Sequence, residues 1–277
     1  YLDKTMSSLM FFASFGESYQ TNLASYNRMK ELLDRPSVIS NGDNLSEINS
    51  IRLDNINFKY NEKLIINDFS YNFGKGNIYW IKGNNGAGKS TLISLILGLY
   101  EDKYEGSIFY DYKDIRSLDM NSIRKNLIGI VEQSPILIED TIINNVTLSL
   151  NYDFEMLNKY IKLVGLENFL YSEEDKLNQI INENSTNISG GEKQKLSILR
   201  ELIKNPSVLI FDEPTSSMDK DSKKEFYKYI QELKAERIII IISHDQVTKE
   251  IADFTIEIGS KFDNNDEEAT NKILERV

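Results

Sequence analysis

The sequence has 277 residues, of which 40% are hydrophobic and 10% aromatic, so the chain can form a sizeable hydrophobic core. Its formal net charge of −11 argues against a nucleic-acid partner, because contacts with a phosphate backbone need a basic face. The absence of cysteine excludes disulfides, thiolate catalysis and cysteine-ligated metal centres.

The N-terminal segment predicts one long helix. Apolar residues recur at spacings of three and four between residues 6 and 34, and the pattern stops before Pro36. Such a helix would be roughly 40 Å long, so we expect residues 1–35 to form a helical arm; an ordinary helix folded back onto the next domain is the alternative. The longest apolar stretch, residues 8–16, is about half a membrane span, so no spanning segment is expected.

A polar stretch at 36–50 contains Pro, Gly and Ser and is expected to be a linker. Beyond it, alternating or continuous apolar patterns predict strands at 51–60, 64–73, 77–82, 106–110, 127–133, 207–211, 237–243 and 254–258. Helical patterns occur at 90–99, through most of 141–170, and at 192–204, 219–235 and 245–252.

The run of isoleucines at 238–242 is typical of a parallel sheet covered on both faces. Because strands and helices alternate in the C-terminal half, we expect an α/β fold with a mainly parallel core sheet. An antiparallel β subdomain would stand at its start, and the stretch 141–170 would form a helical subdomain. We assign 51–260 to this domain and 261–277 to an acidic, faintly helical, solvated tail.

A glycine-rich loop follows the predicted strand 77–82 and precedes a helix. It fits the P-loop pattern G-x-x-x-x-G-K-[ST], and it has the strand–loop–helix context that this motif requires. Backbone N–H groups of the loop and of the helix N-terminus would hold polyphosphate oxygens, Lys89 would contact the β- and γ-phosphates, and Ser90 would bind Mg²⁺. The loop comprises Gly83, Asn84, Asn85, Gly86, Ala87, Gly88, Lys89, Ser90 and Thr91.

Other polar side chains stand at the ends of predicted strands. In a P-loop protein, Asp212 would serve the Mg²⁺ shell, and Glu213 would accept a proton from the attacking water or orient it. His244, the only histidine, follows the isoleucine strand at the carboxyl edge, where ligands of open α/β sheets bind. Gln133 ends another candidate strand and could complete the Mg²⁺ or water shell, although its spacing alone leaves a purely structural role equally open.

These motifs, in this order over residues 51–260, resemble the nucleotide-binding domain of ATP-binding cassette (ABC) transporters. The resemblance implies that Tyr60 stacks on adenine, that Gly83 to Thr91 form the Walker A loop, and that Gln133 is the Q-loop glutamine. It further implies that "ISGGE" (188–192) is the signature motif, with Ser189, Gly190 and Gly191 meeting ATP. Glu213 would then be the catalytic base, Asp219 part of the D-loop, and His244 the switch histidine.

Residues 22–34 resemble the connector that joins the last transmembrane helix of an ABC exporter to its nucleotide-binding domain. The resemblance implies a Mg²⁺-dependent ATPase on the cytoplasmic face of a cell membrane, with a transmembrane domain in the same polypeptide before Tyr1. It also implies pairing with a second nucleotide-binding domain, as a homodimer or heterodimer, in which each ATP lies between the P-loop of one copy and the signature motif of the other. ATP would close this dimer and hydrolysis would reopen it.

Two other functions remain open from the sequence. A soluble ABC-type ATPase of a non-transport complex could use the N-terminal helix as an interaction element, although the acidic charge disfavours ribosome contact. The second alternative is a cassette that binds ATP without hydrolysing it, and the presence of Glu213 and His244 argues against this function. Glu192 replaces the usual glutamine of the signature motif: its charge either opposes an approaching triphosphate or only stabilises the helix N-terminus.

Overall fold

The computed structural model describes residues 2–33, 42–100, 103–148, 150–172, 175–183, 185–216, 218, 220–263 and 266–275 of the chain. The chain divides into two compact units, Tyr1–Ser40 and Asn41–Val277. The first unit contains helix α1 (Leu2–Leu33), which confirms the helix predicted at 6–34. Within the part of the chain that the structure describes, no helix is both long and apolar enough to cross a membrane.

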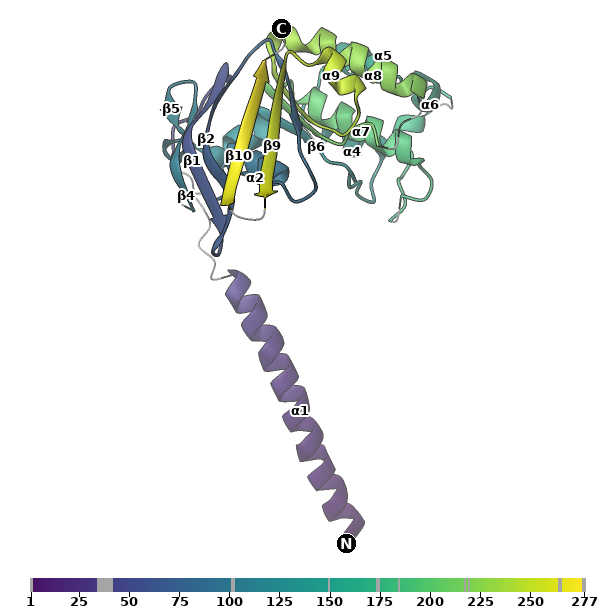
Figure 1. Ribbon diagram of the computed structural model, residues 1–277. Helices are drawn as coiled ribbons and strands as arrows, with labels where there is room; N and C mark the ends of the chain where they lie inside the picture. The colour runs from purple at the N-terminus through teal and green to yellow at the C-terminus, as the bar shows by residue number, and fades with distance from the viewer. Residues whose placement is uncertain are drawn as a thin grey trace. The chain divides into compact units, whose positions relative to one another are not determined.

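The second unit begins with a four-stranded antiparallel sheet in the order β2-β1-β4-β5 (Figure 1). Its long central strand β1 pairs antiparallel with β2 on one side and with β4 on the other. This sheet confirms the predicted antiparallel β subdomain. The strands are β1 (Ser50–Tyr60), β2 (Lys63–Gly74), β4 (Tyr104–Tyr110) and β5 (Lys113–Asp114).

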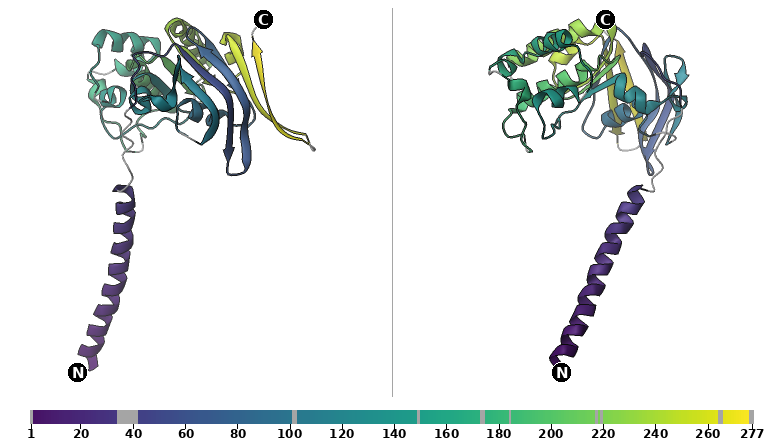
Figure 2. Two further views of the ribbon diagram at one scale, coloured as in Figure 1. Left: turned by 90° about the vertical axis from the view of Figure 1, so that its left-hand side faces the viewer. Right: turned by 180° about the vertical axis from the view of Figure 1, so that it is seen from behind.

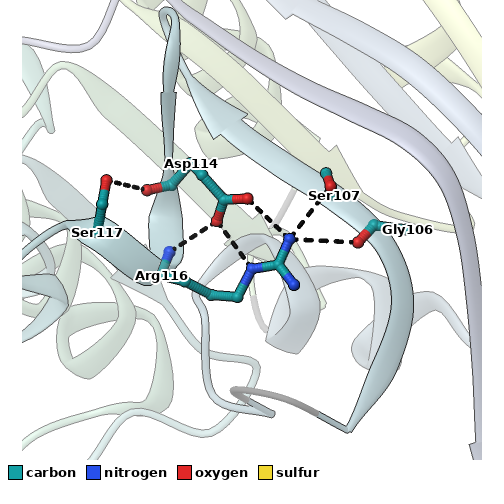
Figure 3. A network of polar contacts seen from close by, with 5 residues as sticks. All are labelled: Gly106, Ser107, Asp114, Arg116 and Ser117. Atoms are coloured by element: carbon teal, nitrogen blue, oxygen red, sulfur yellow. Dashed lines mark hydrogen bonds and ion pairs between the residues drawn. The ribbon is translucent and has the colours of Figure 1, made fainter.

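A polar network fixes the outer edge of this sheet, where β5 passes into the short 3₁₀ helix η1 (Ile115–Ser117) (Figure 3). Asp114 caps η1 by accepting a bond from the Arg116 backbone N–H at 2.9 Å, and it also accepts from the Arg116 guanidinium at 3.0 and 2.7 Å. Arg116 Nη2 in turn donates to Ser107 Oγ on β4 at 3.1 Å. These bonds lower the pKa of the Asp114 carboxyl below its usual value, chiefly through the Arg116 side chain.

The core sheet has six strands in the order β10-β9-β3-β8-β7-β6. Strands β9, β3, β8, β7 and β6 run parallel, and only β10 is antiparallel to its neighbour. The mainly parallel core sheet is therefore confirmed. The strands are β3 (Ile78–Lys82), β6 (Ile128–Val131), β7 (Val208–Asp212), β8 (Ile238–Ile242), β9 (Phe254–Asp263) and β10 (Asp266–Glu275).

The two faces of this sheet belong to two different hydrophobic cores, because successive side chains of a strand point to opposite faces. In β8, Ile238, Ile240 and Ile242 join the core shared with the antiparallel sheet. Ile239 and Ile241 join the second core, on the opposite face. All five isoleucines are 2% exposed or less, which explains why this strand is apolar without interruption.

Helices cover both faces of the core sheet (Figures 1 and 2). Helices α2 (Lys89–Ile96) and α3 (Met120–Asn126) contribute to the first core. The second core is covered by α4 (Ile142–Thr147), α5 (Phe154–Leu163), α6 (Glu167–Leu170), α7 (Gly190–Ile203), α8 (Lys220–Leu233) and α9 (Val247–Ile251). The short 3₁₀ helices η2 (Lys176–Asn178) and η3 (Lys234–Glu236) complete the described elements.

The expectation for the C-terminal tail was wrong. Residues 266–275 form strand β10, which pairs antiparallel with β9 from Asp266↔Asp263 to Glu275↔Phe254. Strand β9 already pairs with β3 along its other edge, so its second edge carries backbone groups that a returning strand can bond. These main-chain bonds override the weak helical pattern and acidic composition of the segment.

The predicted linker at 36–50 also differs from the structure in its described part, residues 42–50. Ile48 is fully buried, and Asp43 bonds through its backbone to Ser117 and to Asp119. Residues 42–50 therefore pack against the β subdomain, although their polar composition predicted a linker. Sequence reasoning also missed β5 and α3, which are too short to establish a clear period.

Candidate active site

The glycine-rich loop connects β3 to α2, as predicted. Gly83 lies so close to β9 that an added Cβ would stand 2.1 Å from the carbonyl oxygen of Ile258. Gly88 is the N-cap of α2 with φ 101°, in the left-handed region that favours glycine. Lys89 folds back over the loop, where its Nζ donates to the carbonyl oxygens of Gly83 at 2.8 Å and Asn84 at 3.1 Å.

The loop forms one wall of a cavity of about 680 Å³. Its volume falls in the range of small-molecule sites, which is roughly 300–1,000 Å³. The cavity is lined by residues of β1, β2, β7 and β8, by residues that follow β6, β7 and β8, and by the P-loop and its helix. The lining residues are Tyr60, Ile65, Asn85, Gly86, Gly88, Lys89, Ser90, Thr91, Gln133, Asp212, Glu213, Ile242 and His244.

Asp212 is the last residue of β7 and stands beside the P-loop lysine. Burial raises the pKa of its carboxyl, and the nearby Glu132 carboxylate raises it further, while the positive charge of Lys89 opposes both effects. A half-buried carboxylate at the end of a buried strand, next to a lysine, is suited to bind a cation together with a polyphosphate.

Glu213 turns out of β7 in an unusual conformation, with φ 48°. Its backbone N–H donates to Ile242 of the adjacent strand β8 at 2.9 Å. Its Oε1 accepts from the His244 backbone N–H at 3.1 Å and lies 3.8 Å from His244 Nε2. A left-handed non-glycine residue costs about 1–3 kcal/mol, and here it directs the carboxylate toward the cavity and toward His244.

The backbone before His244 is anchored from the core. The indole N–H of the buried Trp80, on β3, donates to the Ser243 carbonyl oxygen at 2.8 Å. This bond ties the loop that carries His244 to the strand that leads into the P-loop. The His244 side chain itself is 60% exposed, so it can reach a ligand in the cavity.

The "ISGGE" segment lies elsewhere in the described structure. Ser189 is the N-cap of α7, and Ser189 and Gly190 are exposed. Ser189 Oγ accepts from the Glu192 backbone N–H at 3.3 Å, while Glu192 Oε2 accepts from Ser189 N at 2.8 Å and from Ser189 Oγ at 2.6 Å. This reciprocal arrangement is a capping box, so the Glu192 carboxylate lies directly on the serine of the motif.

The structure therefore brings most of the predicted residues together. Gly83, Asn84 and Ala87 belong to the same loop without lining the cavity, and Ser189, Gly190 and Gly191 stand outside it. Asp219 lies outside the described residues. Sequence reasoning missed Ile65 and Ile242, although Ile242 could have been found as the last apolar residue before Ser243 and His244 at the carboxyl edge.

Ser90, Gln133 and Asp212 offer a hydroxyl, an amide oxygen and a carboxylate to one cavity. Mg²⁺ prefers oxygen ligands and commonly takes one or two carboxylates together with phosphate oxygens and water, so this donor set fits that ion. Among the described residues, no group of three or more histidine, cysteine, aspartate or glutamate side chains could hold a metal by itself.

A glycine-rich loop between a core strand and a helix, with carboxylates at the end of a nearby parallel strand, defines a P-loop nucleoside triphosphatase domain. Comparison with known proteins makes this class more specific. The family model described as ABC transporter matches residues 66–216, so the chain belongs to the ABC transporter family. ABC ATPase domains bind ATP, and ATP hydrolysis is the activity of this ATPase family.

The chain is similar to ATP-binding proteins that are named for transport or translocation. It is 32% identical over 240 residues to a probable ABC transporter ATP-binding/permease protein of Haemophilus influenzae, covering 85% of this chain and 43% of the relative. It is 32% identical over 259 residues to the alpha-hemolysin translocation ATP-binding protein HlyB of Escherichia coli O157:H7, covering 92% of this chain and 36% of the relative.

A solved structure of a bacterial Atm1-family ABC exporter with ATP bound has the same fold as this chain. Its TM-score is 0.75 at 27% sequence identity, over 86% of this chain and 43% of that chain. The chain thus spans less than half the length of these relatives.

Proposed function

We propose that this chain is the Mg²⁺-dependent, ATP-hydrolysing motor domain of an exporter. The observation that carries the proposal is the convergence of Lys89, Asp212, Glu213 and His244 on one cavity beside the P-loop. Binding and turnover of a nucleoside triphosphate need such a set: a phosphate-binding cation, a cation-binding carboxylate, and a base close to the terminal phosphate.

In this mechanism the loop N–H groups, the N-terminus of α2 and Lys89 hold the triphosphate. Ser90, Asp212 and Gln133 would hold Mg²⁺, and the bound ion would neutralise charge on the phosphates. Glu213 accepts a proton from the attacking water as the water oxygen bonds to the γ-phosphorus, and the bond between that phosphorus and the β,γ-bridging oxygen breaks to give ADP and phosphate. The His244 backbone N–H keeps the Glu213 carboxylate in place through its 3.1 Å bond.

In this proposal, the signature-motif residues contact ATP only when a second nucleotide-binding domain is present. These residues are Ser189, Gly190 and Gly191. They do not line the cavity of their own chain, yet Ser189 and Gly190 present an exposed helix N-terminus, which favours negatively charged ligands. We assign them, with Asp219, to the ATP held by the partner copy. ATP binding would then close the dimer, and hydrolysis would remove the free energy that favours the closed state.

Export is supported by the relatives, since ATP-binding/permease proteins combine both parts in one polypeptide. Helix α1 would connect this domain, on the cytoplasmic face of the membrane, to the transmembrane domain of the same polypeptide.

Two substitutions test the catalytic proposal. Glu213→Gln keeps an oxygen that can accept the His244 N–H bond but cannot take the proton, so we expect hydrolysis to fall by about 10²–10⁴-fold while ATP still binds. Lys89→Ala should weaken both binding and hydrolysis. Steady-state turnover by Glu213→Gln close to that of the unmodified chain would remove Glu213 as the base.

A further inference from the structure

Tyr60, which lines the cavity, contacts two other aromatic side chains. Tyr60, at the end of β1, is 46% exposed, and its hydroxyl is hydrogen-bonded to the hydroxyl of Tyr100. The Tyr60 and Tyr100 rings meet edge to face, at 5.8 Å between centroids and 82° between planes. Phe58 contacts both, with its centroid 4.9 Å from Tyr60 and 4.5 Å from Tyr100.

Tyr100 reaches this position through the end of the P-loop helix. Gly98 follows α2 in the left-handed conformation, with φ 64°, and the Leu99 N–H bonds back to the Ser94 carbonyl at 3.0 Å. This pattern is a common helix C-terminal cap, and it turns the chain from α2 toward β1. The same short helix that begins with Lys89 is thus followed, four residues past its end, by the partner of Tyr60.

Tyr100 is partly buried and packs against the first hydrophobic core, whereas it is not among the residues that line the cavity. Packing therefore holds Tyr100 in place, and Tyr100 in turn contacts the more exposed Tyr60. Without that anchor, the Tyr60 ring at a strand end would sample several rotamers, and binding a ligand against it would then cost the ordering of one side chain.

From this geometry we propose that Tyr100 is a positioning residue for the base-binding part of the cavity. It holds the Tyr60 ring, through the hydrogen bond between their hydroxyls, in the orientation that receives the planar base of a nucleotide whose phosphates lie on Lys89. The proposal rests on the proposed function, because it needs a nucleotide in this cavity. Tyr100 itself touches neither the base nor the phosphates.

The test compares two probes on the full chain carrying Glu213→Gln, so that binding reaches equilibrium without turnover. Mg-ATP has both a base and phosphates, whereas Mg-tripolyphosphate has phosphates alone. Isothermal titration calorimetry gives both dissociation constants for Tyr100→Phe, Tyr60→Phe and the double variant. Tyr112→Phe is the matched control, because Tyr112 is 84% exposed and does not line the cavity.

We expect Tyr100→Phe to weaken Mg-ATP by about threefold to tenfold, the range of one net hydrogen bond, and to leave Mg-tripolyphosphate unchanged. Tyr60→Phe removes the same bond from the exposed side, so it should give the same loss, and the double variant should lose no more than either single one. Tyr60→Phe also secures the test if Tyr100→Phe does not fold.

Unchanged ATP affinity in Tyr100→Phe, additive losses, or an equal loss for both probes would each overturn the positioning role. If the proposed function itself is wrong, the result is different: the dissociation constant for Mg-ATP would be the same with and without Lys89→Ala.

Discussion

Replacing Glu192 with glutamine tests what the unusual charge in "ISGGE" does. The Glu192 carboxylate lies 2.6 Å from Ser189 Oγ, the group that we assign to the partner's ATP. A phosphate oxygen bonded to that hydroxyl would stand about 5 Å from the carboxylate, where two unit charges repel by about 1–3 kcal/mol for an effective dielectric constant between that of water and that of a protein surface. We base the expected effect on the lower value, about 1 kcal/mol.

We therefore expect Glu192→Gln to strengthen nucleotide-driven dimerisation by about fivefold for each site, which compounds to about 25-fold in a symmetric homodimer. The stability of helix α7 should fall only slightly. Glutamine also completes a capping box, so only the charge–dipole contribution of about 0.3–1 kcal/mol is lost. On this reasoning, Glu192 would restrain closure of the proposed dimer and would give a small gain in helix stability.

Sedimentation equilibrium in the Glu213→Gln background, with saturating Mg-ATP at low and high salt, measures the effect. The advantage of the Glu192→Gln variant should shrink at high salt, as a screened repulsion must. Glu155→Gln is the control, since Glu155 occupies the first turn of α5 and does not line the cavity. Dimerisation that is equal or weaker in Glu192→Gln, or an advantage insensitive to salt, would refute the reasoning.

Three further predictions concern stability, each measured by urea denaturation. Asp114→Asn should lower the free energy of unfolding by at most about 1 kcal/mol at pH 7, because the ion pair with Arg116 is partly solvated. Since the pKa of Asp114 is lowered in the folded chain, this stabilisation is present above pH 3.8 and is lost as the pH falls below that value. A difference in stability between the two proteins that stays constant with pH would contradict this account. Trp80→Phe leaves the buried Ser243 carbonyl unpaired and should cost about 2–3 kcal/mol, whereas a loss below about 0.5 kcal/mol would show that the bond contributes little. Gly83→Ala should cost about 3 kcal/mol from its 2.1 Å contact with backbone, and near-normal stability would mean that β9 can move aside.

The sequence predicted those parts of the site where a local motif dictates geometry. The P-loop carries its strand, glycines, lysine and helix within one short segment, and the apolar strands before Asp212 and His244 place both residues at one sheet edge. The capping box between Ser189 and Glu192 was not predicted, although the pattern S-x-x-E before an amphipathic helix is its usual signature.

Tertiary contacts account for what the sequence could not predict. Nothing near Tyr100 in the chain indicates that its hydroxyl meets Tyr60, 40 residues earlier. The pairing of β10 with β9 depends on an edge that only the folded sheet creates. Likewise, Ile48 is one apolar residue within a polar stretch, and its burial follows from the β subdomain against which it packs.

The isoleucines of β8 have a consequence for how the sheet finds its alignment. Sliding this strand by one residue would exchange isoleucine for isoleucine on both faces, so its own side chains cannot distinguish the correct register from a shifted one. That information must come from the residues at its ends. Arg237, buried at one end, bonds to the Pro206 carbonyl at 3.1 Å and to Asn205 Oδ1 at 2.6 Å, while Ser243 receives the Trp80 bond at the other. A buried arginine at one edge of the sheet thus helps to decide whether His244 stands beside Glu213 at the opposite edge.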